Sequence, residues 1–324
     1  MYNKINGKKG CRISYFNIAF YAAVMGFGGL SITTHKLEMV YNTNTNISHY
    51  ILFFSIIFFI IVNFLYLLKI LLNFDDVRSD FIHPVKSNFF PGIGKIFLIF
   101  SIAFLNINIE ISKYLWIIGI IWQFIFTVII FRRWIVKEID IKDLNPLWFL
   151  PIVGNMLAPI VGVKIGFIEI SWFLFSIGII MWIVLFTIIM NRIIFHNPLA
   201  NKLLPTLIIL IAPPSVALMS ITALNDGNIL DIAKVFYYFG LFMFIIITTK
   251  INIFSKLKFY MSWWAYSFPI AVLTSATLLL YSQNKDYYLG ILGIILYIIL
   301  LFIILILVYK TILGIKNKEI CIEE

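Results

Sequence analysis

The sequence Ser267-Phe268-Pro269 places a hydroxyl, an aromatic ring and an imino acid side by side within a long apolar segment. Pro269 has no N–H, so it cannot donate a hydrogen bond to the carbonyl of Ala265, and its ring crowds the preceding turn. At membrane depth such a defect is tolerated only where neighbouring protein or a water-filled cavity satisfies the freed carbonyl. We therefore expect Phe268 to face a central pathway, at an angle that the proline sets.

The ring of Phe268 could do two things in such a pathway. It could fill a narrow pore, or it could present its electropositive edge to an anion. At about 1.5 Å per residue, a helix that begins near Phe259 places Phe268 roughly 14 Å along its axis, near the middle of a hydrocarbon core about 30 Å thick. The position predicts a pore gate, and the alternative is a phenylalanine that serves only in packing.

Composition identifies a membrane protein. Hydrophobic residues make up 62% of the chain and charged residues 12%, whereas a soluble domain is about half apolar and about a quarter charged. The net charge of +10 lies mainly between apolar segments, so membrane topology explains it better than nucleic-acid binding does. We expect a single integral membrane domain over residues 1–324, in contact with the lipid bilayer and not with nucleic acid.

Ten apolar segments are long enough to be considered as membrane spans. An all-α protein is predicted, with spans at 14–34, 48–72, 90–105, 113–131, 147–162, 170–191, 203–223, 230–252, 259–282 and 287–309. Twenty of the 25 Lys and Arg residues then lie on one side, and the other five are Lys36, Lys113, Lys164, Lys234 and Lys285. Because cytoplasmic loops are enriched in Lys and Arg, both termini are predicted in the cytoplasm and the protein in the cell's inner (plasma) membrane.

Prolines and glycines divide the spans into two alternating sets. The odd-numbered spans contain the predicted helix breaks, which are Gly26, Pro151, Pro159, Pro213, Pro214 and Pro269, whereas no even-numbered span contains proline. Broken helices need satisfied backbone groups and close packing, which favours the interior. The alternation predicts five helical hairpins, with an inner ring of odd helices around a central pore. A plain ten-helix bundle with incidental prolines is the alternative.

Uncharged polar side chains are the predicted lining of this pore. The candidates are Asn17, Asn155, Ser215, Ser267 and Thr274. Three of them, Asn155, Ser215 and Ser267, could equally bond backbone carbonyls that nearby prolines leave free. Lys95 is assigned to the inner connecting segment, so no Lys or Arg is expected at mid-membrane depth. No catalytic pair, phosphate loop or metal-ligand spacing stands out, and we expect neither enzyme activity nor a cofactor.

Several motifs resemble one known family. They are Trp263–Pro269, Asn145–Pro151, Ile211–Pro214, His83–Lys86 and Ser14–Phe16. Together they resemble the tellurite-resistance/dicarboxylate transporter family, which includes bacterial TehA proteins, yeast malic acid permeases and plant slow-type guard-cell anion channels. The resemblance extends over nearly the whole chain and is most specific at Trp263–Pro269.

The resemblance implies a homotrimer in which each protomer has its own pore. It implies five hairpins in a quasi-fivefold arrangement, with Phe268 as the occluding aromatic. Asn17 stands where the family often has glycine, so its side chain would narrow or polarise the pore mouth. The function implied is an anion channel for small monovalent anions such as chloride or nitrate.

A secondary transporter of four-carbon dicarboxylates such as malate, or a tellurite-resistance exporter, is the alternative function. A carrier usually holds a cationic or helix-terminal anchor at the midplane of the membrane. The expected absence of Lys and Arg at that depth favours the channel. Broken helices could still offer backbone N–H groups to an organic anion, so the carrier remains open.

Overall fold

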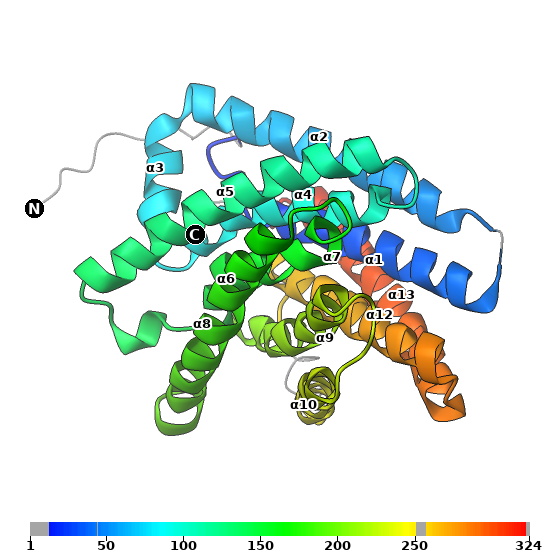
Figure 1. Ribbon diagram of the computed structural model, residues 1–324. Coiled ribbons are helices and arrows are strands. Elements are labelled where there is room, and N and C mark those ends of the chain that lie inside the picture. Colours follow the sequence, from blue (N-terminus) through cyan, green and yellow to red (C-terminus); the bar gives the residue numbers. More distant parts are fainter. Residues whose placement is uncertain (1–12, 44, 251–256, 322–324) are drawn as a thin grey trace, which may run out of the picture.

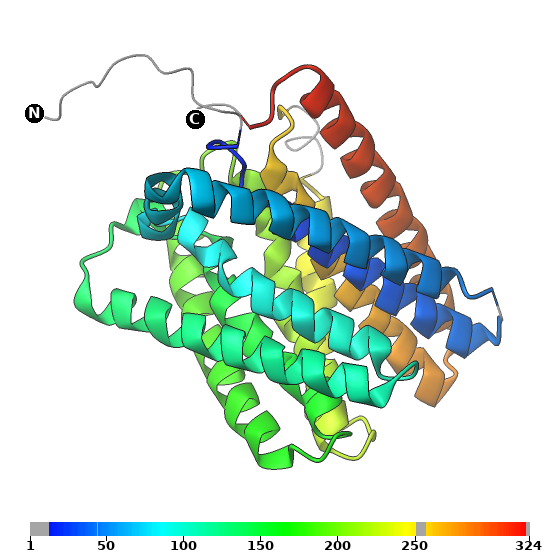
Figure 2. The same cartoon turned by 90° about the horizontal axis from the view of Figure 1, so that it is seen from above.

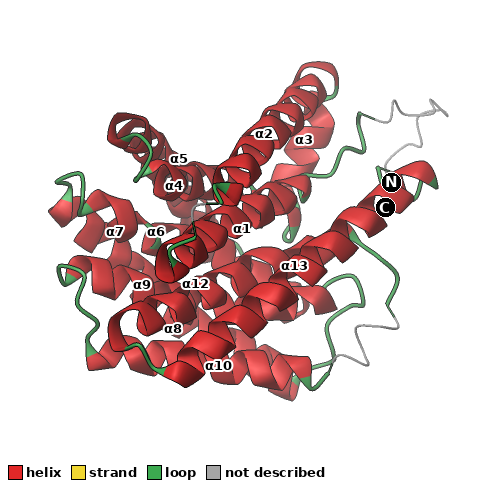
Figure 3. Ribbon diagram, turned by 90° about the vertical axis from the view of Figure 1, so that its right-hand side faces the viewer, coloured by secondary structure: helices red, strands yellow, loops and turns green. Residues whose placement is uncertain are grey.

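The computed structural model describes residues 13–43, 45–250 and 257–321. Within these ranges every regular element is a helix (Figure 3). The elements are α1 Phe20–Tyr41, α2 Ile47–Leu72, α3 Phe74–Ile82, η1 Lys86–Phe89, α4 Pro91–Phe104, α5 Ile109–Val136, η2 Ile141–Asp143, η3 Pro146–Phe149, α6 Leu150–Met156, α7 Ala158–Gly162, α8 Ile168–Phe195, η4 Leu204–Ile211, α9 Ala212–Leu224, α10 Asp231–Thr248, η5 Met261–Tyr266, α12 Ser267–Asn284 and α13 Tyr287–Lys316, where η marks 3₁₀ helix.

Eight helical segments in the described part are long and apolar enough to cross a membrane. The predicted spans 14–34 and 147–162 are not among them. In the first, α1 begins only at Phe20, after Asn17 Oδ1 has accepted a hydrogen bond from Ala19 N at 2.9 Å. Its 22 residues are long enough, but its glycines, its hydroxyl residues and the charged Lys36 and Glu38 make it less apolar than the other spans. In the second, the apolar stretch Pro146–Gly162 is shorter and is divided between η3, α6 and α7. The ten-span arrangement therefore stays a prediction.

Burial separates the long helices into two sets. In η1–α4, η4–α9 and η5–α12 between 72% and 78% of the most apolar stretch is buried, whereas in α2, α5, α8, α10 and α13 the share is 28–33%. The exposed faces of the second set carry large apolar side chains such as Phe53, Ile125 and Phe302. Such a surface suits hydrocarbon and would be unfavourable in water.

The buried helices form a ring (Figure 1). α1 packs against α4, α4 against α6 and α7, these against α9, α9 against α12, and α12 against α1. Each member of the ring also packs against the long helix that follows it in the chain, and Figure 2 shows this for α1 and α2, the dark and lighter blue helices. The ring therefore has five positions, of which α6 and α7 together occupy one.

The prolines of the ring lie where α-helices begin. Pro151 is in the first turn of α6, which follows η3; Pro213 and Pro214 are in the first turn of α9, which follows η4; and Pro269 is in the first turn of α12, which follows η5. Pro159 is in the first turn of α7. A proline in the first turn removes an N–H that has no intrahelical partner. Pro151, Pro213, Pro214 and Pro269 thus mark junctions of 3₁₀ and α-helix, whereas Pro159 lies where α6 ends and α7 begins.

Gly26 allows α1 and α12 to approach each other closely. A Cβ atom at this position would lie 2.3 Å from Ser267 Oγ and 2.6 Å from Ser267 Cβ. Further along the same contact, Thr33 Oγ1 lies 2.9 Å from the carbonyl of Ala271 and 2.8 Å from Ser275 Oγ. The glycine predicted to shape the pore is therefore a packing residue of the ring.

We predict that Gly26→Ala lowers the thermal unfolding temperature of the purified protein in detergent. Overpacking of a close contact costs about 1–3 kcal/mol, which exceeds the gain of up to about 1 kcal/mol from the higher helix propensity of alanine. Gly92→Ala is the matched control, because a Cβ there would meet only Met25 Cε, at 3.5 Å. Adding Ser267→Gly to the Gly26 variant should restore the temperature. Wild-type stability of Gly26→Ala would contradict this account of the contact.

Candidate functional site: a row of cavities around Lys95 and Phe268

Three cavities lie in a row inside the ring of helices. We name them the Lys202 cavity, of about 80 Å³, the central cavity, of about 30 Å³, and the His35 cavity, of about 200 Å³. At each of the five ring positions, the chain lines first the Lys202 cavity, then the central cavity and then the His35 cavity. The residues, in that order, are Asn17, Met25 and His35 around α1; Lys86, Lys95 and Asn106 around α4; Leu147, Val153 and Lys164 around α6 and α7; Leu203, Ile209 and Met219 around α9; and Met261, Phe268 and Ser275 around α12. Five segments that run in one direction thus enclose a single axis.

The central cavity holds one charged side chain, Lys95. This lysine is 1% exposed, and its Nζ lies 5.8 Å from the centroid of the Phe268 ring. Among the residues that the structure describes, no hydrogen-bond acceptor and no carboxylate lies within bonding distance of this Nζ. A buried ammonium without a partner is costly, so the site is suited to receive an anion.

The position of Lys95 corrects the prediction of an uncharged pathway. The count of charges assigned it to an inner connecting segment, but it lies in the second turn of α4, which begins at Pro91. The signal was present in Pro91-Gly92-Ile93-Gly94-Lys95, where the proline marks a helix start and places the lysine inside the span. An ionisable residue within a span indicates function by default.

Phe268 lies at the closed side of the central cavity. It is 8% exposed and lines the central cavity with Pro269, and Ser275, further along α12, lines the His35 cavity. Gly29 on α1 makes room for the ring, since a Cβ there would lie 3.4 Å from Phe268 Cδ2. The neighbouring Trp264 is held by a hydrogen bond from its Nε1 to Thr311 Oγ1 at 3.0 Å. The ring therefore stands between the central cavity and the His35 cavity.

Four of the polar residues predicted to line a pore bond backbone carbonyls instead. Asn155, Ser215, Ser267 and Thr274 are buried, and none of them lines one of the three cavities. Their bonds run from Asn155 Nδ2 to Pro151 O (3.1 Å), Ser215 Oγ to Ile211 O (2.8 Å), Ser267 Oγ to Trp264 O (2.7 Å) and Thr274 Oγ1 to Ile270 O (2.7 Å). Asn17, the fifth candidate, does line the Lys202 cavity.

The Lys202 cavity is electropositive. His83, Lys86 and Lys202 line it. Burial, followed by the charges of Lys86 and Lys202, lowers the pKa of His83 from its ordinary value. Lys86 and Lys202 therefore supply the positive charge at this end of the row, and Asp80, which lies 3.1 Å from Lys86 Nζ, partly offsets it.

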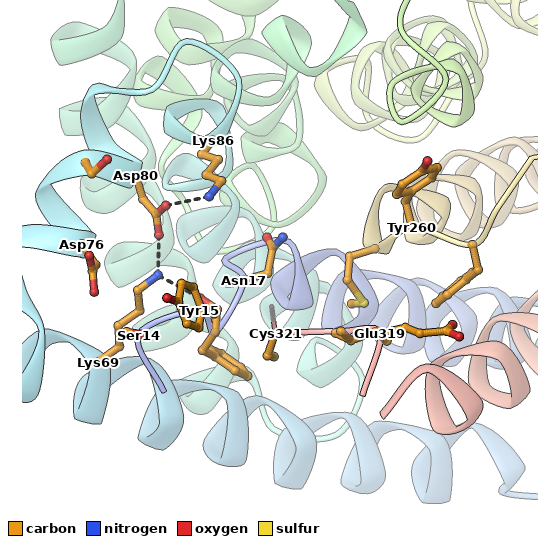
Figure 4. Close-up of a pocket in the computed structure, with 15 residues that line it drawn as sticks. Ser14, Tyr15, Asn17, Lys69, Asp76, Asp80, Lys86, Tyr260, Glu319 and Cys321 are labelled. Carbon is orange, nitrogen blue, oxygen red and sulfur yellow. Dashed lines mark hydrogen bonds and ion pairs between the residues drawn. The ribbon is translucent and has the colours of Figure 1, made fainter. Parts of the chain in front are cut away.

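A second pocket at the same end joins the two described ends of the chain (Figure 4). Lys69 Nζ lies 2.6 Å from Asp80 Oδ2, and Lys86 Nζ lies 3.1 Å from Asp80 Oδ1. Lys69 also donates to the carbonyl of Phe16 at 3.0 Å, which fixes the segment before α1. The pocket is lined by residues 14–17 at one end of the chain and 319–321 at the other.

The described residues contain no group of three or more His, Cys, Asp or Glu side chains that could hold a metal ion. The Lys95 amine is a cation and cannot serve as a ligand for one while it is protonated. The chemistry that the row offers is binding of anions by Lys95 and by the lysines at its two ends.

Comparison with known proteins gives a consistent result. The SLAC1 family model, described as a voltage-dependent anion channel, matches residues 15–312. The uncharacterized transporter MJ0762 of Methanocaldococcus jannaschii is 28% identical, over 95% of this chain and 97% of that protein. The S-type anion channel SLAH2 of Arabidopsis thaliana is 29% identical, over 81% of this chain and 52% of that protein. The tellurite resistance protein TehA homolog of Haemophilus influenzae is 21% identical, over 82% of this chain and 81% of that protein.

We predict that Lys95→Met unfolds at a higher temperature than the wild type when no small anion is present, because it removes an unpaired buried charge. Replacing gluconate with nitrate should stabilise the wild type, by about 1.4 kcal/mol at tenfold over the dissociation constant. The variant should lose most of this gain. Lys137→Met, at an exposed position after α5, should behave as the wild type. An undiminished nitrate effect in Lys95→Met would show that the anion does not bind there.

Proposed function

Because the chain belongs to the SLAC1 family, as the motifs in its sequence had indicated, we propose that it is an anion channel for small monovalent anions such as chloride and nitrate. The anions would pass along the row of cavities within each protomer, and Phe268 would be the gate. Membership of the family supports anion transport in general. The geometry of this chain supports the pathway, the ion size and the gate.

The observation that carries the proposal is the unpaired Lys95 amine in the central cavity. Its attraction for an anion is strong because little solvent screens it in the interior. One fixed positive charge without a carboxylate repels cations. Contact with the ammonium would compensate part of the free energy that each anion loses when it sheds its water. Selection among anions would therefore depend on how much dehydration costs each of them.

The size of the central cavity favours small anions. Its volume is about 30 Å³, and a cavity needs about 10–15 Å³ to hold one water molecule. A chloride or nitrate with little accompanying water is compatible with this space. A four-carbon dicarboxylate would require the helices of the ring to separate.

In this proposal all ten predicted segments cross the membrane as five hairpins in a quasi-fivefold arrangement. The closed ring of α1, α4, α6–α7, α9 and α12 supports it, as does the apolar surface of the helices outside the ring. The end that carries Lys69, Lys86 and Lys202 would face the cytoplasm, in agreement with the excess of cations there. The His35 cavity would then face outward. Following the family resemblance, we expect three protomers, which light scattering of the detergent-solubilised protein would test.

The observation of Lys95 also favours a second candidate, a carrier of dicarboxylates. A cationic anchor near mid-membrane is what such a carrier needs, and Lys95 provides one. Two of the similar proteins are named as a transporter and as a tellurite resistance protein. The small volume of the central cavity weighs against this candidate and in favour of the channel.

Reconstitution of the purified protein in planar bilayers distinguishes the two candidates. A channel should show unitary currents that reverse near the chloride or nitrate equilibrium potential, and permeability should follow the ease of dehydration. Saturable malate exchange without unitary current would contradict the channel and support the carrier.

We predict that Phe268→Ala raises the basal chloride conductance of reconstituted protein at least about tenfold, which corresponds to about 1.4 kcal/mol of barrier. Moving the ring of the wild type out of its rotamer costs about 0.5–1.5 kcal/mol, and lost packing adds to this. Phe173→Ala on α8 is the matched control, since this phenylalanine is 54% exposed on the outer surface. If Phe268→Ala is no leakier than Phe173→Ala at equal protein density, Phe268 is not the gate.

A further inference from the structure

The His35 cavity is a second place in the molecule where basic side chains converge. Lys36 on α1 and Lys164 after α7 line it, together with His35 and with His49 on α2. Its volume of about 200 Å³ is several times that of the central cavity. All five positions of the ring contribute to its wall, so it opens onto the axis on the side of Phe268 away from Lys95.

His35 is connected to several neighbours. Its Nε2 lies 3.1 Å from Asn106 Nδ2, and its ring centroid lies 6.1 Å from that of His49. Its Nδ1 lies 3.9 Å from Glu38 Oε2. That carboxylate also accepts a hydrogen bond from Ser48 Oγ at 2.5 Å. Because the Asn106 Nδ2 can only donate, Nε2 is the acceptor in this arrangement, and a neutral His35 then carries its proton on Nδ1.

We propose that the His35 cavity is an anion-binding site separate from Lys95, formed by Lys36 and Lys164 and strengthened when His35 and His49 are protonated. The ligand class is the small inorganic anion, halide or nitrate. The inference rests on the proposed function in one respect: anions held here would be those that pass Phe268. Binding to the cavity does not itself require transport.

The charge of the cavity changes in the physiological pH range. With neutral histidines, the two lysines exceed the single carboxylate of Glu38 by one positive charge, and with both histidines protonated the excess is three. Burial lowers the pKa of His35 below its ordinary value of about 6.5, with a partial offset from the Glu38 carboxylate, and burial together with the charge of Lys164 lowers the pKa of Lys36 to about 8. Between pH 7 and pH 5.5 Lys36 therefore stays mostly charged while His35 gains charge. From α4, α9 and α12 the described lining residues include Asn106, Met219 and Ser275 and no ionisable side chain.

Protonation would also rearrange one contact. A protonated His35 carries a hydrogen on Nε2 and can no longer accept from the Asn106 amide nitrogen. The amide would turn so that its oxygen accepts from the ring. This frees the Asn106 N–H groups to point elsewhere in the cavity, where they can donate to an anion.

Bromide is the probe that tests binding directly. Crystals of the full chain grown in bromide at pH 5.5 should show an anomalous scattering peak in the His35 cavity, within contact distance of Lys36 or Lys164. At pH 7 the peak should be weaker, and His35→Gln with His49→Gln should remove the pH dependence. No peak at pH 5.5, or equal occupancy at both pH values in the wild type, would overturn the proposal.

Conductance provides the second measurement. Lowering the pH from 7 to 5.5 on the side of the His35 cavity should raise chloride conductance about threefold at ~10 mM salt, and the rise should nearly vanish at ~1 M salt, where screening is strong. The double histidine variant should lack the rise. His196→Gln, at the exposed end of α8, should keep it. A rise of equal size in the double variant contradicts the proposal.

The two measurements separate the proposals. If the wild type passes no chloride at any pH but binds bromide in this cavity with the expected pH dependence, the channel function is wrong and the binding site stands. If chloride passes and bromide does not bind there, the channel stands and the binding site is wrong.

Discussion

The physical constraint on which this structure depends is the burial of the Lys95 ammonium beside Phe268 without an acidic partner. Transfer of a charge from water to a protein interior costs several kcal/mol even after relaxation. The described residues do not compensate that cost. A fold selected for stability alone would place an apolar residue here, so the lysine makes sense when its partner is a mobile anion. The ring of helices then has to enclose this amine tightly enough to exclude most water.

Tight enclosure follows from the way the ring is built. Gly26 and Gly29 bring α1 onto α12 beside Ser267 and Phe268. On the opposite wall, a Cβ at Gly154 would lie 2.2 Å from the Gln123 side chain, so α6 also needs glycine where it meets α5. The 3₁₀ segments leave carbonyls that hydroxyl and amide groups satisfy internally, as a membrane interior requires. Small residues and internal hydrogen bonds together let five short segments converge on a cavity of about 30 Å³.

Much of this fold, but less of the site, could be predicted from the sequence. Apolar segments and the odd-numbered prolines indicated which segments lie inside, because hydropathy and missing N–H groups act locally. Local pattern could not indicate that α12 begins at Ser267 directly after the 3₁₀ helix η5, with Pro269 in its first turn, because hydropathy and the position of a proline fit either type of helix. Counting Lys and Arg on each side of the membrane placed Lys95 in a connecting segment, because the count assigns charged residues near the end of a span to the adjoining loop. Asn155 and Ser215 donate hydrogen bonds to backbone carbonyls and do not line the cavities. Composition alone does not distinguish a polar side chain bonded in this way from one that faces a pore.

The distribution of charge along the axis agrees better with a channel than with a carrier. Lysines lie at both ends of the row and a single lysine lies at its centre. A positive cavity at each mouth raises the local anion concentration from either side. The central cavity and the His35 cavity are both present in the same conformation, with the ring of Phe268 standing between them. Alternating access requires one bundle of helices to rock against another around the site. In the proposed channel a change at Phe268 alone would join the cavities, and a closed five-membered ring would resist the larger motion.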